Sequence, residues 1–322
     1  MKRVLFVAAA SCLMAVSEYA GAQVREIPYG NMENWMVRRV DESLVIGGKT
    51  RYLYEVAKGD TLKDNTPFVP KLNVSPWATS SVLAVVKGVT KSSCTVFPEH
   101  HGNGMAARLE TRIERVKVLG LINISVLATG TIFLGEIVEP VRDTKDPQAK
   151  LMMGIPFTER PQSIIYDYKF EQGADNGKRL KMTGFSRVQD VPGVNSAEMC
   201  LLLQKRWEDA DGNVYAKRVG TAWVRYSSGT KGWINGNEVK ILYGDITGNP
   251  EFQPYMGLID AGEGAPHCKN SKGKAVPIKE VGWASPGEKP THIILRFSSG
   301  HGGAYVGSPG AMFHIDNVKL KY

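Results

Sequence analysis

The last ten residues of the chain, Phe313-His314-Ile315-Asp316-Asn317-Val318-Lys319-Leu320-Lys321-Tyr322, decide the fold class. Apolar and polar residues alternate as far as Ile315, the alternation breaks at Asp316, and it resumes up to Tyr322. Alternation with a period of two is typical of a strand that buries one face and exposes the other to water. We therefore predict that the chain ends as a strand inside a sheet, with a small irregularity at the Asp316 carboxylate.

A second short apolar stretch with a single acidic residue stands near the other end, Ile27-Pro28-Tyr29-Gly30-Asn31-Met32-Glu33-Asn34-Trp35. Together the two ends resemble secreted jelly-roll carbohydrate-binding modules. Those modules begin with N-G-x-F-E followed by a Trp, and end with an apolar residue followed by D-D/N-V-x-L. Gly30–Trp35 and Ile315–Leu320 match this pattern, with Met32 in place of the usual Phe. The resemblance implies that both ends lie side by side in one β-sandwich.

A closer resemblance is to the putative carbohydrate metabolism domain family of secreted bacterial proteins. Its motifs follow one another along almost the whole chain after the first 22 residues. The stretches that carry it are Ile27–Trp35, Gly102–Thr111, Gly130–Glu136, Gly154–Pro161, Tyr166–Phe170 and the C-terminal strand. This resemblance implies an exported β-sandwich concerned with carbohydrate.

Composition also favours strands. The chain has 34 Gly and 17 Pro residues among 322, and clusters of Gly, Asn, Asp and Ser separate short alternating runs, which is typical of all-β domains. Cys200–Glu208 and Val214–Val224 flank an Asp-Gly turn and predict a hairpin. Ile278–Trp283 is expected to be helical. The predicted fold is an all-β, antiparallel jelly-roll β-sandwich with long loops and few short helices, covering residues 23–322, with 23–95 as a partly separate section.

The first 22 residues have the features of a signal peptide. Met1-Lys2-Arg3 is positively charged, an apolar run follows, and Ala20-Gly21-Ala22 fits a cleavage site. The apolar run is too short for a membrane span of about 20 residues. Lipidation at Cys12 is the alternative to cleavage after Ala22. We predict an exported protein, periplasmic, cell-surface or extracellular, without a transmembrane segment.

Charge and cysteine content exclude some classes. The formal net charge is +8, but the basic residues are spread along strands among acids, whereas nucleic-acid binding usually needs a clustered basic face. Three cysteines remain after the signal peptide, Cys94, Cys200 and Cys268. They are too few for a disulfide framework, and either one bridge or three buried thiols would fit.

Aromatic residues in loop-like surroundings are the candidate carbohydrate-binding residues. Apolar rings pack against the C–H faces of sugars, and neighbouring polar groups bind the hydroxyls. The candidates are Trp77, Trp233, Trp283 and Tyr305; Trp233 lies between glycines and asparagines. The alternative is that these rings anchor loops onto the sheet. Trp207 and Trp223 lie in strands and are expected in the core.

Glu33 and Asp316 are the candidate metal ligands. In the jelly-roll modules that the chain resembles, the corresponding acids commonly help hold a structural calcium ion. Calcium takes six to eight oxygen ligands, and Gly102–Ala106 lies where the related modules offer backbone oxygens. The alternative is that both acids are solvated, or that Asp316 accepts backbone N–H groups.

Three functions are compatible with this sequence. The leading interpretation is an exported, non-catalytic carbohydrate-binding or glycan-utilisation accessory protein, whose partner is a polysaccharide or oligosaccharide. The second is a glycoside hydrolase, which needs two carboxylates about 5 to 9.5 Å apart; Glu136, Glu159 and Asp167 lie in the family-like motifs, but no local pattern selects a pair. The third is a structural or adhesive envelope protein that binds other envelope proteins.

Overall fold

The computed structural model describes residues 23–68, 74–118, 122–143, 146–184, 188–262 and 264–322. Strands account for 55% of it and helices for 5%, which confirms the all-β prediction. The signal peptide and Cys12 lie outside the described residues. None of the helices in the described part has the length and apolarity needed to cross a bilayer.

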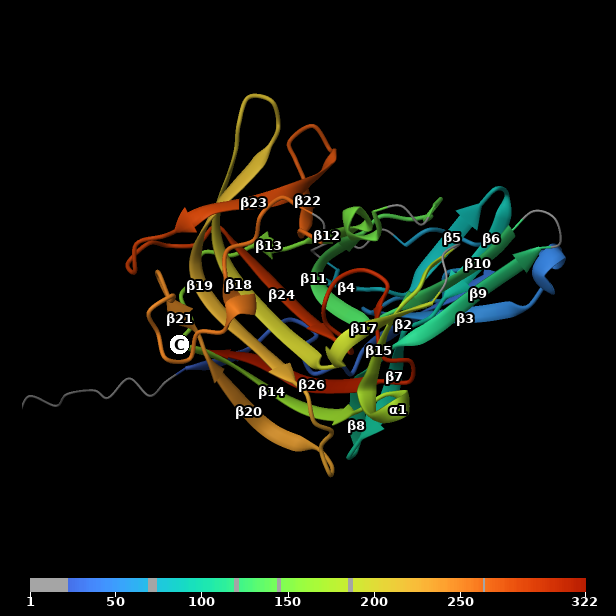
Figure 1. The fold of residues 1–322 in the computed structure, drawn as a ribbon, viewed down its shortest axis with the longest axis horizontal. Helices are drawn as coiled ribbons and strands as arrows, with labels where there is room; N and C mark the ends of the chain where they lie inside the picture. Colours follow the sequence, from blue (N-terminus) through green and yellow to red (C-terminus); the bar gives the residue numbers. More distant parts are fainter. Residues whose placement is uncertain (1–22, 69–73, 119–121, 144–145, 185–187, 263) are drawn as a thin grey trace, which may run out of the picture.

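Two larger sheets form the body (Figure 1). The six-stranded sheet contains β1 (Val24–Glu26), β7 (Val96–His101), β8 (Gly104–Glu110), β14 (Ser163–Glu171), β20 (Ile234–Lys240) and β26 (Met312–Lys321). The ten-stranded sheet contains β4 (Trp77–Thr79), β11 (Thr131–Ile137), β12 (Leu151–Met153), β13 (Ile155–Pro156), β18 (Ala197–Glu208), β19 (Val214–Tyr226), β21 (Leu242–Tyr243), β22 (His267–Lys269), β23 (Ala275–Trp283) and β24 (His292–Ser298).

Four small sheets complete the described strands. They are β2 (Trp35–Asp41) with β3 (Thr50–Val56); β5 (Val82–Val86) with β6 (Val89–Ser93); β9 (Arg112–Val118) with β10 (Ile122–Ala128) and β16 (Thr183–Gly184); and β15 (Lys178–Lys181) with β17 (Gln189–Val194) and β25 (Val306–Gly307). The helical segments are single turns: η1 (Leu44–Ile46), α1 (Ala174–Gly177), η2 (Pro147–Lys150) and η3 (Pro254–Met256).

The two ends of the described chain meet, as predicted. Strand β1 pairs antiparallel with β26, the C-terminal strand. Just beyond it, Ile27 donates its N–H to the carbonyl of Val318, and Val318 donates to Gly30. Strand β26 also shows the predicted irregularity, because its register against β14 shifts next to Asp316 and Asn317 adopts φ 54°.

The core between the two larger sheets follows from the alternation of their strands. Residues Met199, Leu201 and Leu203 of β18 belong to the same buried cluster as Ile164 and Phe313 of the six-stranded sheet. Intervening residues of β18 point to the opposite face, as the pleat requires. This packing of one sheet on another is the coarse arrangement that the sequence indicated.

The second sheet does not remain an open layer, so the jelly-roll prediction fails in its detail. Strand β11 pairs with both β24 and β12, which closes the path β24-β18-β19-β23-β22-β12-β11 into a mixed seven-stranded barrel. Two of its pairings, β19–β23 and β12–β22, are parallel, so the sheet is not purely antiparallel. The segment 278–283, expected to be helical, lies in strand β23.

The section 23–95 contributes to both larger sheets through β1 and β4. Its remaining strands form the hairpins β2–β3 and β5–β6. Figure 1 shows the hairpins β5–β6 and β9–β10 at the right, away from β19 and β23. Val89 of β6 and Ile124 of β10 share a small buried cluster, so these hairpins pack together. We refer to β5, β6, β9 and β10 as the wing.

Candidate functional site

The strands of the barrel place a set of charged residues inside it. On β18, Glu198, Cys200 and Leu202 alternate with the residues that face the sandwich core. Cys200 and Leu202 belong to a second buried cluster, together with Trp223 of β19 and Ile294 of β24. The face that carries Glu198 therefore looks into the barrel, because side chains two residues apart in a strand share a face.

Glu198 lies at one mouth of the barrel between two arginines. Its side chain is 3% exposed. Oε2 accepts a hydrogen bond of 2.8 Å from Nε of Arg225, and Oε1 accepts one from Arg296. Register explains the contact, because Glu198 pairs with Arg225 across β18–β19 and Arg296 pairs with the neighbouring Cys200 across β18–β24. We call these three residues the mouth cluster.

The two arginines decide the charge of Glu198. Burial raises the pKa of the Glu198 carboxyl, but the positive charges of Arg296 and Arg225 outweigh burial, and the net effect lowers it. Glu198 is therefore ionised at neutral pH. A buried carboxylate with two guanidinium partners leaves the mouth cluster with one net positive charge.

Two donors of this region have no hydrogen-bond acceptor. Nε of Arg296 and Nε1 of Trp223 are both buried and lack a partner. The Trp223 indole N–H lies near Glu198 and favours its ionised form, yet it does not reach hydrogen-bond geometry. Buried donors are normally satisfied, but both atoms are closed to water, so they lie behind the lining of this mouth.

The loop that follows β24 adds two rings. Nδ1 of His301 accepts the backbone N–H of Ser196 at 3.0 Å. Burial lowers the pKa of His301, and the charges of Arg179 and Arg225 lower it further, so the imidazole is neutral. Burial and the charge of Asp143 raise the pKa of Tyr305 to about 12, so its phenol stays protonated.

These side chains line a cavity of about 560 Å³. This volume lies within the range of roughly 300–1,000 Å³ found for small-molecule sites. Its polar lining includes Asp143, Glu198, Arg225, Arg296, Ser298, His301 and Tyr305, and its apolar lining includes Val82, Ala84, Val86, Val116, Ile124, Val126 and Trp223. The cavity thus extends from the barrel mouth to the wing.

A buried ion pair separates this mouth from the other end of the barrel. Arg218 and Glu280 are both 0% exposed and form a salt bridge, and Gln204 also donates to Glu280. The opposite mouth has a smaller cavity of about 300 Å³ lined by Glu136, Arg206 and His292, among others. Glu136 is paired there with Lys269.

A second polar cluster lies on the six-stranded sheet. His101, Asp167 and Asp316 bring three potential ligand atoms within 4.8 Å of one another. Nδ1 of His101 lies 2.7 Å from Asp316, and the ring of Trp233 stacks on His101 at 3.8 Å between centroids. Asp167 accepts hydrogen bonds from Gly236 and Asn317. We call His101, Asp167 and Asp316 the sheet cluster.

The sheet cluster contains only one of the two predicted metal ligands. Asp316 belongs to it, whereas Glu33 accepts the N–H of Met105 at 3.0 Å and is not a member. Glu33 does lie against the Gly102–Ala106 segment named from the sequence, but as an acceptor of backbone N–H. The histidine also makes the set less suitable for calcium, which prefers oxygen ligands.

The predicted aromatic residues have different environments. Trp77 is fully buried and donates its Nε1–H to the carbonyl of Pro28, so the structure contradicts its assignment to sugar binding. Trp283 is half-buried against the barrel cluster, with Arg218 over its ring. Trp233 is half-buried on His101. Of the four candidates, only Tyr305 lines the large cavity.

Sequence reasoning missed the mouth cluster. Trp223 was expected in the core; it is 9% exposed and borders the cavity. Trp207, also expected in the core, is 43% exposed. One signal was available: Glu198 and Arg296 each lie within a short apolar run, residues 197–203 and 293–297, and a charge in such a position needs a buried partner. Glu159 pairs with Arg25 on the surface, which gives it an ordinary structural role.

No protein-family model and no curated protein matches this chain, so the resemblance to the carbohydrate metabolism family is not confirmed. Among solved structures, one putative glycoside hydrolase from Bacteroides thetaiotaomicron matches with a TM-score of 0.46 and 14% identity over 86% of this chain and 76% of its own. Another, from Bacteroides vulgatus, matches with a TM-score of 0.42 and 14% identity over 92% and 94%.

The names of these two structures contradict our leading interpretation. Both are named as putative glycoside hydrolases, which agrees with our second interpretation and not with the non-catalytic binding protein. With TM-scores below 0.5 they carry no argument about what this chain does.

Proposed function

We propose that this protein is a glycoside hydrolase that binds its substrate, part of an oligosaccharide or polysaccharide, in the large cavity beside Glu198. One observation carries this proposal: an ionised, almost fully buried carboxylate lies next to a Trp ring and a second acid lines the same cavity. Glycoside hydrolysis uses two carboxylates that flank the scissile bond. Apolar rings pack on sugar faces.

Glu198 has a role that follows from its charge. It is ionised, so it acts as the nucleophile or base and stabilises the positive charge that develops on the sugar. Asp143 has a role that follows from its place: it is a second acid of the same cavity, lies near Tyr305, and donates a proton to the leaving oxygen from its acid form. Neutral His301 and protonated Tyr305 supply hydrogen bonds to sugar hydroxyls.

The test is hydrolysis of a panel of polysaccharides and aryl glycosides, measured by release of reducing sugar or phenol. Glu198→Gln should lower kcat/KM by at least about a hundredfold, because a positioned carboxylate contributes roughly 10²–10⁴ in rate. Asp143→Asn should lose most activity on substrates with poor leaving groups. It should retain activity on dinitrophenyl glycosides, which need no proton from an acid.

Two sets of controls separate this site from others. Glu114→Gln changes another acid of the same cavity, one that lies near Lys91, and should leave kcat/KM within a few-fold. Asp167→Asn and Asp316→Asn change the sheet cluster and should do the same. Activity that disappears in the sheet-cluster variants but survives in Glu198→Gln moves the active site to that sheet. No release from any glycan overturns the proposal.

Export and calcium binding remain proposals as well. Residues 1–22 support cleavage and export by their sequence alone, and N-terminal sequencing of secreted protein tests it. The sheet cluster is the place to test for a cation. A thermal melt with added Ca²⁺ or Zn²⁺ measures this, because a ligand bound only by the folded state raises Tm. An unchanged Tm with both ions would show that the sheet cluster binds neither.

A further inference from the structure

The cavity has two chemically different ends. The barrel mouth supplies Glu198, Arg225, Arg296 and His301, whereas the wing supplies a group of aliphatic side chains from β5, β9 and β10 beside the polar residues Lys91, Ser92, Ser93 and Glu114. On β5, the alternate residues Val82, Ala84 and Val86 line the cavity, and Leu83 between them packs on the other side with Val40 and Leu53. The strand therefore turns one face toward the cavity and one toward a small core.

Two other wing strands extend this aliphatic wall. Val116 of β9 and Ile124 and Val126 of β10 also line the cavity, whereas β6 contributes mainly the polar residues Lys91, Ser92 and Ser93. Val82, Ala84, Val86, Val116 and Val126 all keep intermediate exposure, although they point into a concavity. Apolar surface left open to water in a cavity is unfavourable, so this wall gains free energy when an apolar group covers it.

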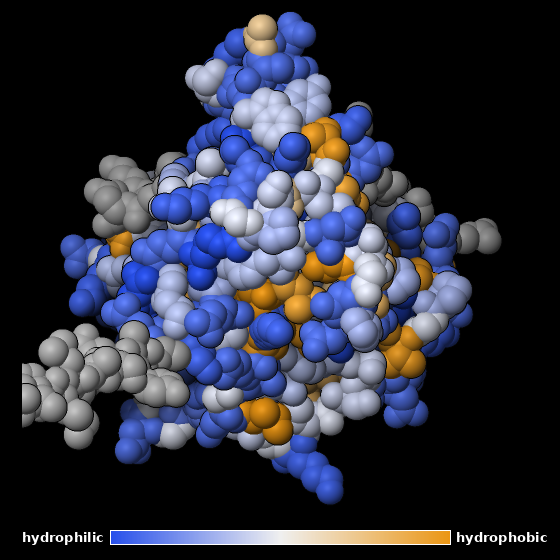
Figure 2. Space-filling view, turned by 90° about the vertical axis from the view of Figure 1, so that its left-hand side faces the viewer, coloured by the Kyte–Doolittle hydropathy of each residue, from blue (hydrophilic) through white to orange (hydrophobic). Residues whose placement is uncertain are grey.

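The face shown in Figure 2, the left-hand end of the molecule in Figure 1, is mostly hydrophilic, with apolar residues near its centre and in smaller patches around it. The aliphatic wall is also continuous with the polar barrel mouth in a single cavity. An occupant that matches both ends has a polar, acceptor-bearing part and an apolar part joined to it.

We propose that the substrate is an amphipathic glycoside, a sugar whose aglycone is an alkyl or acyl chain or a similar apolar group. This inference deepens the proposed function and rests on it. The sugar lies beside Glu198 and Trp223, where the exposed parts of Arg225 and Arg296, which line the cavity, meet its oxygens. The apolar aglycone extends along β5, β9 and β10. The volume of about 560 Å³ suits a sugar with a chain of drug-like size.

Binding and turnover are measured separately, so that the two proposals can fail independently. The probes are n-octyl and methyl β-glycosides of glucose, galactose and xylose, each below its micelle concentration. Calorimetry with the Glu198→Gln variant gives Kd, and wild-type protein gives kcat/KM. We expect at least one octyl glycoside to bind more than tenfold more tightly than its methyl partner, since each buried methylene contributes about fourfold.

Val126→Asp puts a charge into the wall and should reduce the octyl-to-methyl affinity ratio to nearly one. Val86→Ser is the milder companion and should reduce it partly, which keeps the test valid if the aspartate variant does not fold. The matched control is Val281→Asp, which changes an exposed valine of β23 outside the cavity. It should leave the ratio as in the parent protein.

The outcomes are distinct. If octyl glycosides bind through the wall and neither they nor any glycan is hydrolysed, the hydrolase proposal is refuted. The proposal of an amphipathic ligand then stands. Hydrolysis of plain oligosaccharides with equal affinity for octyl and methyl glycosides keeps the hydrolase and overturns this inference. Equal octyl-to-methyl ratios in Val126→Asp and the parent also overturn it, because the chain then lies elsewhere.

Discussion

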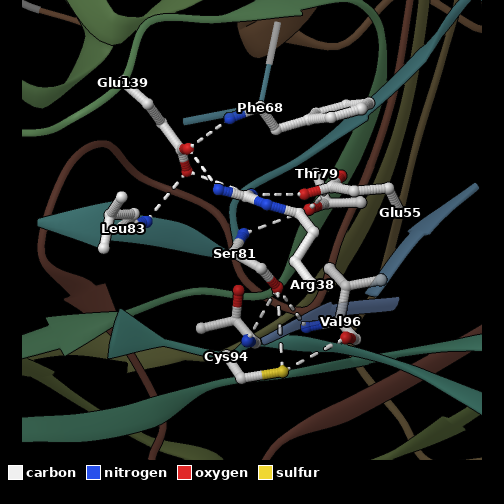
Figure 3. Close-up of polar contacts among 10 residues, drawn as sticks. Arg38, Glu55, Phe68, Thr79, Ser81, Leu83, Cys94, Val96 and Glu139 are labelled. Carbon is white, nitrogen blue, oxygen red and sulfur yellow. Dashed lines mark hydrogen bonds and ion pairs between the residues drawn. The ribbon is translucent and has the colours of Figure 1, made fainter. Parts of the chain in front are cut away.

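Two buried ion-pair clusters in this protein have opposite charge composition. The mouth cluster has one carboxylate, Glu198, and two arginines. The other cluster has one arginine, Arg38, and two carboxylates, Glu55 and Glu139 (Figure 3). We call it the sealed cluster, because Arg38 and Glu55 side chains are 1% exposed and Glu139 is 0% exposed.

The sealed cluster satisfies its acceptors from within the protein. The N–H groups of Phe68 and Leu83 donate to Glu139 at 3.0 and 2.8 Å, and the Thr79 hydroxyl lies 3.3 Å from Glu55. Figure 3 shows Arg38 between the two carboxylates. These contacts tie β2, β3, β4 and β5 to the segment after β11, so the cluster holds the section 23–95 onto the barrel.

The mouth cluster differs in where it lies. Each cluster leaves one buried arginine Nε without a partner, Arg38 in the sealed cluster and Arg296 in the mouth cluster, but of the two it is the mouth cluster whose residues line a cavity. Buried ion pairs are therefore unequal indicators of function. A cluster enclosed on all sides is structural, whereas one whose charged residues line a cavity is a candidate site.

The largest expected effect comes from removing the arginine of the sealed cluster. Arg38→Met leaves two carboxylates buried without a counter-charge, and breaking a buried pair costs about 3–5 kcal/mol. We expect a loss of that size in the free energy of unfolding, measured by chemical denaturation. The control, Arg39→Met, removes an exposed partner of Asp41 and should cost about 0–1 kcal/mol. Equal losses in both variants would show that Arg38 has no special structural role.

The next effect is on the pH dependence of activity. Arg296→Met removes a charge that lowers the pKa of Glu198, so that pKa rises. The pH below which kcat/KM falls should therefore move upward, by at least about one unit. The exposed Arg115→Met on β9 should leave the profile in place. If the acidic limb of the pH profile of kcat/KM does not move in Arg296→Met, Glu198 does not control catalysis. The difference between the two clusters would then have no bearing on function.

Local patterns predicted much of the fold. Alternation placed the C-terminal strand, and the Asp-Gly turn predicted the hairpin of β18 and β19 correctly. Barrel closure could not be predicted, because it depends on pairing between distant residues: Thr131 and Ser298, which share a hydrogen bond, are 167 residues apart. No local signal marks such contacts, and a parallel strand such as β23 resembles a helix in a short window.

The candidate site was predicted only in part for the same reason. Tyr305 was found because a ring in a Gly-rich loop is conspicuous. Glu198 and Arg296 become partners only through the register of β18 and β24, which the sequence does not reveal. Each lies within a short apolar run of its strand, and that observation could have marked both as buried charges, although not as a pair.

The smallest effect tests the excess acid of the sealed cluster. Burial raises the pKa of Glu55 to about 7, against the pull of Arg38. A carboxyl whose pKa is higher in the folded than in the unfolded chain stabilises the folded state fully at a pH below its pKa in the unfolded chain, near 4.5. It loses that contribution as the pH rises toward 7. Glu55→Gln removes this titration and leaves Arg38 paired with Glu139 alone.

The Tm of Glu55→Gln relative to the parent should therefore increase between pH 4.5 and 7, by a few degrees, and level off above pH 7. Thermal melts across this range measure it, and Glu159→Gln, at a surface pair, provides the control. A difference in Tm that falls as the pH rises would mean that Glu55 is stabilised as a carboxylate. One arginine would then satisfy two acids, and the charge composition of the two clusters would no longer explain their different roles.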